Sequence, residues 1–169
     1  MSMWRRVSSI IGSVVFLIVA PGTVAGFVPW WMYQWRMQGP LLGLEFLRWV
    51  GIALILAGVT ILLEAFARFA WHGLGTPAPV FPTKRLVVTG LYRHVRNPMY
   101  VAVTSTIFGE GLLLGNAKLM GYGVCVWLAF FAFVLAYEEP TLRRTYGREY
   151  AAFCDAVPRW IPRLRPWRG

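Results

Sequence analysis

Four long apolar runs dominate this sequence, and they restrict its fold more than any other feature. The runs cover about residues 10–32, 44–66, 98–115 and 119–137. About 20 consecutive apolar residues are enough for a helix to cross the hydrocarbon core of a bilayer. We therefore predict an all-α integral membrane protein with about four transmembrane helices, forming a single membrane domain over residues 1–169.

The composition agrees with this prediction. Apolar residues make up 57% of the chain and charged residues only 14%, whereas a water-soluble domain of this size needs a larger charged surface. The first run follows Arg5 and Arg6, which is also typical of a cleaved signal peptide, with residues 23–25 as a candidate cleavage site. The run continues past this site, which favours a transmembrane helix with a bend at Pro21-Gly22.

The last two runs should form a helical hairpin. Only Gly115–Lys118 separates them, so their helices are expected to be antiparallel neighbours. Asn97 suits the N-cap of the first hairpin helix, and Pro98 suits its first helical position. With four spans, the N-terminus and the segments 70–97 and 138–169 lie on one side of the membrane.

The basic residues favour a cytoplasmic location for that side. The chain has 17 Lys and Arg against 7 Asp and Glu, and most of the basic residues fall on the predicted common side. A basic balance also occurs in nucleic-acid-binding proteins. Here the charges flank apolar runs, so we expect membrane lipids as partners and no nucleic acid, and the sequence implies no protein partner.

The C-terminal part is expected to lie at the membrane interface. From Pro140 onward, Leu142, Tyr146 and Tyr150 share one face of a predicted amphipathic helix. The last stretch, PRWIPRLRPWRG, alternates Pro, Arg and Trp, and we expect it to be extended on lipid headgroups.

Two distant polar segments should meet at the ends of the hairpin. GLYRHVRNPMY precedes the third apolar run, and YEEP follows the fourth. The adjacent carboxylates of Glu138 and Glu139 repel each other, so a bound cation would stabilise them. Tyr92 and Tyr100 add flat apolar surfaces with hydroxyl groups. This combination suits a ligand with an amino-acid end, a positive centre and an aromatic ring, although the charges could also simply flank the helices.

Three residues are candidates for catalysis. His94 could act as a base, and Arg96 could hold an anionic group. Glu110, a carboxylate within an apolar run, could orient or deprotonate the acceptor. The alternatives are an interfacial histidine, a flanking positive charge, and a Glu110 that hydrogen-bonds to Thr104, Thr106 or another helix. Neither cysteine has metal-ligand spacing, and we expect no metal site.

The segment LVVTGLYRHVRNPMY, the apolar hairpin, YEEP and YGREYAAFCDAVPRWIP together resemble the integral membrane methyltransferases. That superfamily includes isoprenylcysteine carboxyl methyltransferases and phosphatidylethanolamine N-methyltransferases. The resemblance covers about residues 83–162. It implies a site at the cytoplasmic end of the bundle for S-adenosyl-L-methionine, with S-adenosyl-L-homocysteine as the product. The cofactor-binding positions that the resemblance implies are Lys84, Arg85, Leu86, Val87, Tyr92, Asn97, Pro98, Met99, Tyr100, Glu138 and Glu139, with Glu138 holding the cofactor's amino group.

The resemblance also bears on the methyl acceptor, which should be lipophilic. NPMY and YEEP are closer to the phospholipid branch, whose acceptor is an amine. Val134 stands where the prenylcysteine branch usually has an arginine, whereas the VPRWIP tail is closer to that branch. A carboxyl methyltransferase of the isoprenylcysteine type is therefore the alternative. An NADPH-dependent membrane reductase, which would share a similar hairpin and tail, and a non-catalytic membrane protein are the alternatives from other classes.

Overall fold

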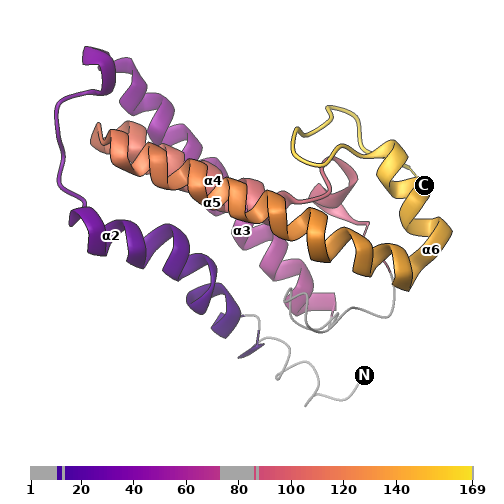
Figure 1. Ribbon diagram of the computed structural model, residues 1–169. Coiled ribbons are helices and arrows are strands. Elements are labelled where there is room, and N and C mark those ends of the chain that lie inside the picture. The colour runs from indigo at the N-terminus through magenta and orange to yellow at the C-terminus, as the bar shows by residue number, and fades with distance from the viewer. Residues whose placement is uncertain (1–10, 13, 73–85, 87, 169) are drawn as a thin grey trace.

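The computed structural model describes residues 11–12, 14–72, 86 and 88–168, and every regular element in them is a helix (Figure 1). Val14–Tyr33, Phe46–Arg68 and Ala117–Ala156 each contain a stretch long and apolar enough to cross a membrane, and Pro98–Leu114 is a shorter apolar helix. The predicted all-α membrane fold is confirmed. The elements are η1 (Thr23–Phe27), α2 (Val28–Tyr33), η2 (Leu41–Gly43), α3 (Phe46–His72), η3 (Gly90–Arg93), α4 (Pro98–Leu114), α5 (Ala117–Phe133), η4 (Val134–Glu138) and α6 (Glu139–Ala156).

Helix α4 is the most enclosed helix, because it packs closely against α3 and also contacts α5 and η1. Glycines allow the close approach to α3. A Cβ atom at Gly58 would lie 2.5 Å from Oγ1 of Thr106, and one at Gly51 would lie 2.6 Å from the carbonyl oxygen of Gly109. These distances are shorter than any real Cβ contact, so the two antiparallel backbones meet only where α3 has no side chain.

The predicted hairpin of α4 and α5 is confirmed, and its turn follows from two residues. Gly115 adopts a left-handed φ of 68°, which a glycine tolerates without strain and which ends α4. The side-chain oxygen of Asn116 accepts hydrogen bonds from the backbone N–H groups of Lys118 (3.0 Å) and Leu119 (3.2 Å). This is an N-cap, so the turn both stops one helix and starts the next.

Asn97 occupies the N-cap position of α4 as predicted, with Pro98 following it, but its side chain does not cap the helix. The Asn97 side-chain amide donates to the carbonyl oxygen of Arg159 at 3.2 Å instead. The contact joins the start of α4 to a residue of the C-terminal tail, and no local sequence pattern indicates it.

Helices α5 and α6 are continuous through the π-helical segment η4. Together they form one helical stretch from Ala117 to Ala156. Its apolar part ends at Tyr137, and the remainder is polar. Pro140 falls in the first turn of α6, where the absence of an N–H group is tolerated.

The apolar face of α6 is present as predicted, but it is covered by the protein. Tyr150, Phe153 and Val157 form a buried cluster, and Leu86, Val88, Leu142, Tyr146 and Trp167 pack against it. A break at Gly147, with φ 52° and ψ −119°, divides the helix ahead of this cluster. The expectation that this face lies against the membrane is corrected, because neighbouring segments of the chain bury it first.

The C-terminal tail, residues 157–168, is not a separate extended segment as expected, because it is hydrogen-bonded to another part of the chain. Backbone N–H groups of Arg163 and Trp167 donate to the carbonyl oxygens of His94 and Arg93, each at 2.9 Å. The N–H group of Arg96 donates to the carbonyl oxygen of Pro158, also at 2.9 Å. The tail therefore folds back from α6 onto the segment before α4 (Figure 1).

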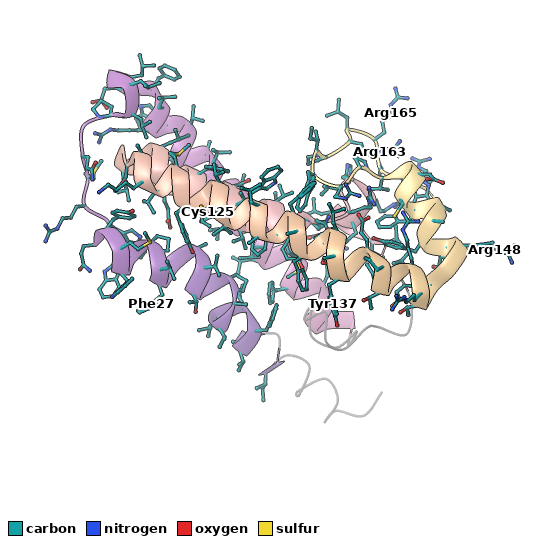
Figure 2. The ribbon with its side chains drawn as sticks, in the orientation of Figure 1. Phe27, Cys125, Tyr137, Arg148, Arg163 and Arg165 are labelled. Atoms are coloured by element: carbon teal, nitrogen blue, oxygen red, sulfur yellow. The ribbon has the colours of Figure 1, made fainter. Side chains whose placement is uncertain are left out.

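The helices place the polar segments at one end of the bundle. The end of α3, the start of α4, the end of α5, α6 and the tail share that end, while the α2–α3 connection and the α4–α5 turn share the other (Figure 1). A hydrogen bond from the N–H group of Gln38 to the carbonyl oxygen of Leu114, 2.9 Å long, joins the latter two. Figure 2 shows Arg148, Arg163 and Arg165 together at the α6 end, away from Phe27.

Candidate cofactor site

The two segments that the sequence analysis expected to meet do so through Tyr100 and Glu138. Tyr100 lies in the first turn of α4, and its hydroxyl donates to Oε2 of Glu138 at 2.8 Å. The Tyr100 ring packs against Phe130 of α5, with ring centroids 4.7 Å apart. The hairpin explains this contact, because it brings the first turn of α4 alongside the last turn of the α5–η4 stretch.

Tyr92 belongs to the same neighbourhood. It lies in η3, and burial, followed by the negative charges of Glu138 and Glu64, raises the pKa of its hydroxyl above the ordinary tyrosine value. Glu138 is thus one of the charges that influence Tyr92 from another segment of the chain. The contact between Tyr100 and Glu138 joins α4 to η4.

Glu139 has a different set of partners. Its Oε1 accepts hydrogen bonds from Nη1 of Arg96 (3.0 Å) and Nε of Arg159 (2.6 Å), and its Oε2 accepts from Nη2 of Arg159 (3.0 Å). The residue is only 7% exposed. Burial alone would raise the pKa of the carboxyl, but the hydrogen bond from Arg159 and the charges of Arg96 and Arg159 outweigh it and hold that pKa below its usual value.

Two adjacent carboxylates therefore have separate structural roles. Glu139 is neutralised by two arginines, and Arg96 also donates to Sγ of Cys154 at 3.0 Å. Glu138 forms no salt bridge within the part of the chain that the structure describes, and it accepts a hydrogen bond only from an uncharged tyrosine. Of the two carboxylates, Glu138 is the one that no described arginine or lysine neutralises.

Arg93 and His94 hold the tail against the site. Nε of Arg93 donates to the carbonyl oxygen of Trp167 at 2.5 Å. Nδ1 of His94 lies 2.8 Å from the carbonyl oxygen of Arg163, so it carries the proton and donates there. The neutral ring then retains only Nε2 for a role as a base.

The other predicted site residues are placed as follows. Pro98 is buried at the start of α4 and Met99 is half-buried beside it. Leu86 packs against the apolar cluster of α6. Lys84, Arg85 and Val87 lie outside the described residues.

Glu110 is not among the residues that converge with Glu138. It lies ten residues after Tyr100 on α4, or about 15 Å along the helix axis at 1.5 Å per residue. The alternative of a hydrogen bond to threonine is not observed, because Thr104 donates to the carbonyl oxygen of Tyr100 (2.7 Å) and Thr106 donates to that of Ala102 (3.0 Å). Oε2 of Glu110 is buried and has no hydrogen-bond partner among the described residues.

Sequence reasoning gave Arg159 no role, although the structure places it in the ion cluster of Glu139. Arg159 lies within the VPRWIP motif, which is the only signal in the sequence that could have indicated it. Gly90 was also missed. It adopts φ 56°, a left-handed conformation that favours glycine, and a Cβ atom there would lie 2.5 Å from Nε of Arg68 at the end of α3.

This fold and site define a class of protein. It is a helical membrane protein in which Tyr100 donates to a carboxylate, Glu138, that has no salt bridge to a described residue, where the helices of a hairpin end on one side of the bundle. Residues 46–149 match the model of the phospholipid methyltransferase family, so the chain belongs to that family.

The chain is similar to curated proteins with two kinds of name. Protein-S-isoprenylcysteine O-methyltransferase B of Arabidopsis thaliana is 33% identical over 79 residues, which cover 46% of this chain and 40% of that protein. A phosphatidylethanolamine N-methyltransferase of Phaeosphaeria nodorum is 28% identical over 131 residues, which cover 75% of this chain and 14% of that protein. The chain thus spans less than half the length of these relatives. No solved structure gives a significant match.

Proposed function

We propose that this protein transfers a methyl group from S-adenosyl-L-methionine to a lipophilic acceptor at the cytoplasmic face of the membrane. The observation that carries the proposal is the Glu138 carboxylate, which accepts a hydrogen bond from Tyr100 and is left without a salt bridge to a described residue. A family whose members transfer methyl groups, and a site suited to a ligand with an ammonium and an aromatic ring, support the same reaction.

The residues present fit this cofactor. Glu138 would bind its ammonium group by a charge-assisted hydrogen bond, and the tyrosine rings would cover its apolar parts. Asn97, Pro98 and Met99 would form the adjoining wall at the start of α4. Glu139 and Arg96 would not contact the cofactor themselves and would instead fix the backbone around the site. When bound, the cofactor supplies an electrophilic methyl group, so the protein has mainly to bind, align and exclude water.

The distribution of charge supports the cytoplasmic face. Among the described residues, the α6 end carries Arg68, Arg93, Arg96, Arg143, Arg144, Arg148, Arg159, Arg163, Arg165 and Arg168, whereas the opposite end carries Arg36, Arg48 and Lys118. Short loops rich in arginine are retained in the cytoplasm during insertion. A water-soluble cofactor would then reach Glu138 from the cytoplasm, and a lipid acceptor would reach it sideways from the inner leaflet.

An amine acceptor of the phospholipid type is favoured over a carboxylate acceptor. Binding a carboxylate needs an available cation, but Arg96 and Arg159 are both paired with Glu139. Val134, one turn before Glu138, is only 1% exposed and offers no charge. An amine attacks only when it has lost its proton, and Nε2 of His94 is the candidate acceptor of that proton. The relatives named for isoprenylcysteine keep the carboxyl acceptor as the second candidate.

The proposal is tested with purified full-length protein in lipid nanodiscs and isotopically labelled S-adenosyl-L-methionine. A membrane lipid extract and an S-prenylcysteine analogue are offered separately, and the products are identified by mass spectrometry. We expect the label in an amine-containing phospholipid. Label in the prenylcysteine analogue would replace the favoured acceptor by the alternative, and no transfer to either would contradict the proposed function.

A further inference from the structure

The C-terminal tail runs back along α5 and contacts residues that lie well before the end of the apolar part of this helix. The ring of Trp160 lies 6.0 Å from the ring of Phe131 and 6.2 Å from that of Trp127, measured between centroids. The apolar part of this helical stretch ends at Tyr137. At 1.5 Å per residue, Phe131 and Trp127 lie about 9 and 15 Å before that point. Trp160 is therefore placed inside the membrane-spanning zone of the bundle.

The residues beside Trp160 turn apolar side chains outward. Ile161 is 79% exposed and Leu164 is 97% exposed, the latter being the most exposed large apolar side chain in the described part of the chain. On α5, Leu128, the residue after Trp127, is 51% exposed. In water such exposure would be unfavourable, at about 25 cal/mol for each Å² of apolar surface.

The backbone of the tail is suited to an apolar surrounding. An unpaired backbone N–H group is costly in lipid, and Pro158, Pro162 and Pro166 have none. The N–H group of Arg163 and the carbonyl oxygens of Pro158, Arg159 and Arg163 are paired with residues 94–97. This segment thus avoids or satisfies many of its backbone polar groups without forming a helix.

Charged residues stand where the tail turns back toward α6. Arg165 and Arg168 are exposed, and the Trp167 ring between them packs on Phe153 of α6, with centroids 5.7 Å apart. A guanidinium at this level would meet lipid phosphate groups, which attract arginine in the cytoplasmic leaflet.

From these observations we infer that residues 159–164 form a re-entrant segment that inserts Ile161 and Leu164 among the acyl chains of the cytoplasmic leaflet. Arg165 and Arg168 bind anionic headgroups above them. The tail is therefore a lipid-binding surface as well as the cover of the Asn97–Glu139 region, and its placement does not depend on which methyl acceptor the protein uses.

Site-directed spin labelling tests this placement. In full-length protein carrying Cys125→Ala and Cys154→Ser, a single label is attached after Leu164→Cys, with the background checked for unchanged thermal stability. Power saturation then compares collisions with oxygen, which concentrates in lipid, and with a water-soluble nickel complex. Leu128→Cys on the lipid-facing side of α5 and Arg148→Cys on the polar part of α6 provide matched references.

We expect the label at position 164 to resemble the one at 128, with oxygen access exceeding nickel access. A label at 164 that resembles the one at 148 would overturn the inference. In vesicles containing anionic lipid, the label should be more deeply placed than in zwitterionic vesicles, and Arg165→Gln with Arg168→Gln should remove the difference. Equal depth of the label in both kinds of vesicle would overturn the inference that Arg165 and Arg168 bind anionic headgroups. The readout uses no methyl donor, so its failure is distinct from failure of the proposed reaction.

Discussion

Glu138 and Glu139 are adjacent, yet the structure gives them different surroundings. Glu139 is held by Arg96 and Arg159, while Glu138 accepts a hydrogen bond from Tyr100. Because consecutive helical residues point about 100° apart, one carboxylate faces the α4 start and the other faces the tail. The resemblance implied cofactor binding by both carboxylates. In the structure two arginines engage Glu139, so the proposed cofactor contact is assigned to Glu138.

Replacing Tyr100 by phenylalanine tests whether its hydroxyl group orients Glu138 for cofactor binding. The substitution removes the hydrogen bond to Glu138 and keeps the ring that packs on Phe130. Without it Glu138 is less well oriented, and we expect S-adenosyl-L-homocysteine to bind more weakly by about 0.5–1.5 kcal/mol, or about two- to tenfold in Kd. Calorimetric titration measures the change. Tyr137→Phe serves as the control, because Tyr137 is an exposed tyrosine in the same helical turn as Glu138. Equal losses of affinity in both variants would refute the orienting role of Tyr100.

The ion cluster of Glu139 makes stability depend on pH in a definite direction. Its pKa is lower in the folded protein than in the unfolded chain, so its contribution is complete above the ordinary glutamate value of about 4.3 and is lost as the pH falls through the depressed folded value. Thermal unfolding from pH 7 downward should therefore show a steeper loss of Tm in the wild type than in Glu139→Gln. Glu149→Gln, at an exposed carboxylate of α6, should keep the wild-type slope. A Glu139→Gln profile parallel to the wild type would contradict this account.

At the scale of elements, the tail is held to the start of α4 by side chains that no local pattern connects. Arg159 binds Glu139 through two parallel hydrogen bonds, and its carbonyl oxygen accepts from Asn97. A fork of this geometry fits a guanidinium and not an ammonium. Arg159 therefore adds a side-chain anchor to the backbone hydrogen bonds that hold the tail against the site.

Arg159→Gln should release the tail without unfolding the bundle. Loss of hydrogen bonds to a charged group costs about 1.5–3 kcal/mol, so we expect local opening and amide exchange in the tail to increase about 10- to 100-fold. Hydrogen–deuterium exchange should report this at Arg163 and Trp167, whose amides bond to the segment before α4. Arg159→Lys should recover only part of the protection, and Arg144→Gln on the exposed side of α6 should change nothing. Unchanged amide exchange in Arg159→Gln would show that Arg159 does not hold the tail in place.

The contact of α3 with α4 depends on the absence of side chains at two glycines. A Cβ atom at Gly58 would lie 2.6 Å from the carbonyl oxygen of Ala102, which belongs to a backbone that cannot move aside. Gly58→Leu should therefore lower the free energy of unfolding by about 1–3 kcal/mol through overpacking. Gly121→Leu on α5, where nothing lies within 4 Å of the added atom, is the matched control. A similar Tm for both variants in detergent would show that the helices are not in close contact.

At the scale of the whole molecule, the sequence was sufficient for the parts that depend on local patterns. Apolar runs located the helices, a glycine and an asparagine located the hairpin turn, and the hairpin alone required Tyr100 and Glu138 to approach each other. These features follow from the length of a helix and the chemistry of its ends.

The parts that could not be predicted depend on contacts between distant segments. The tail docks mainly through backbone groups, which every residue possesses and which leave no signature in the sequence. Composition therefore indicated a basic, aromatic tail on headgroups, but not its attachment to His94 and Arg93. Likewise, the apolar face of α6 was visible, but whether lipid or protein covers it depended on where Leu86 and Trp167 fold.

The central claim, that Glu138 binds the ammonium group of a sulfonium nucleotide, is tested most directly by titrating S-adenosyl-L-homocysteine into wild-type protein, Glu138→Gln and Glu45→Gln. Glu45 lies at the opposite end of the bundle, so its variant controls for the loss of one charge. The account predicts a Kd about 10- to 100-fold higher for Glu138→Gln, from the loss of about 1.5–3 kcal/mol, and an unchanged Kd for Glu45→Gln. Equal affinity in all three proteins, or binding of NADPH with none of S-adenosyl-L-homocysteine, would contradict it.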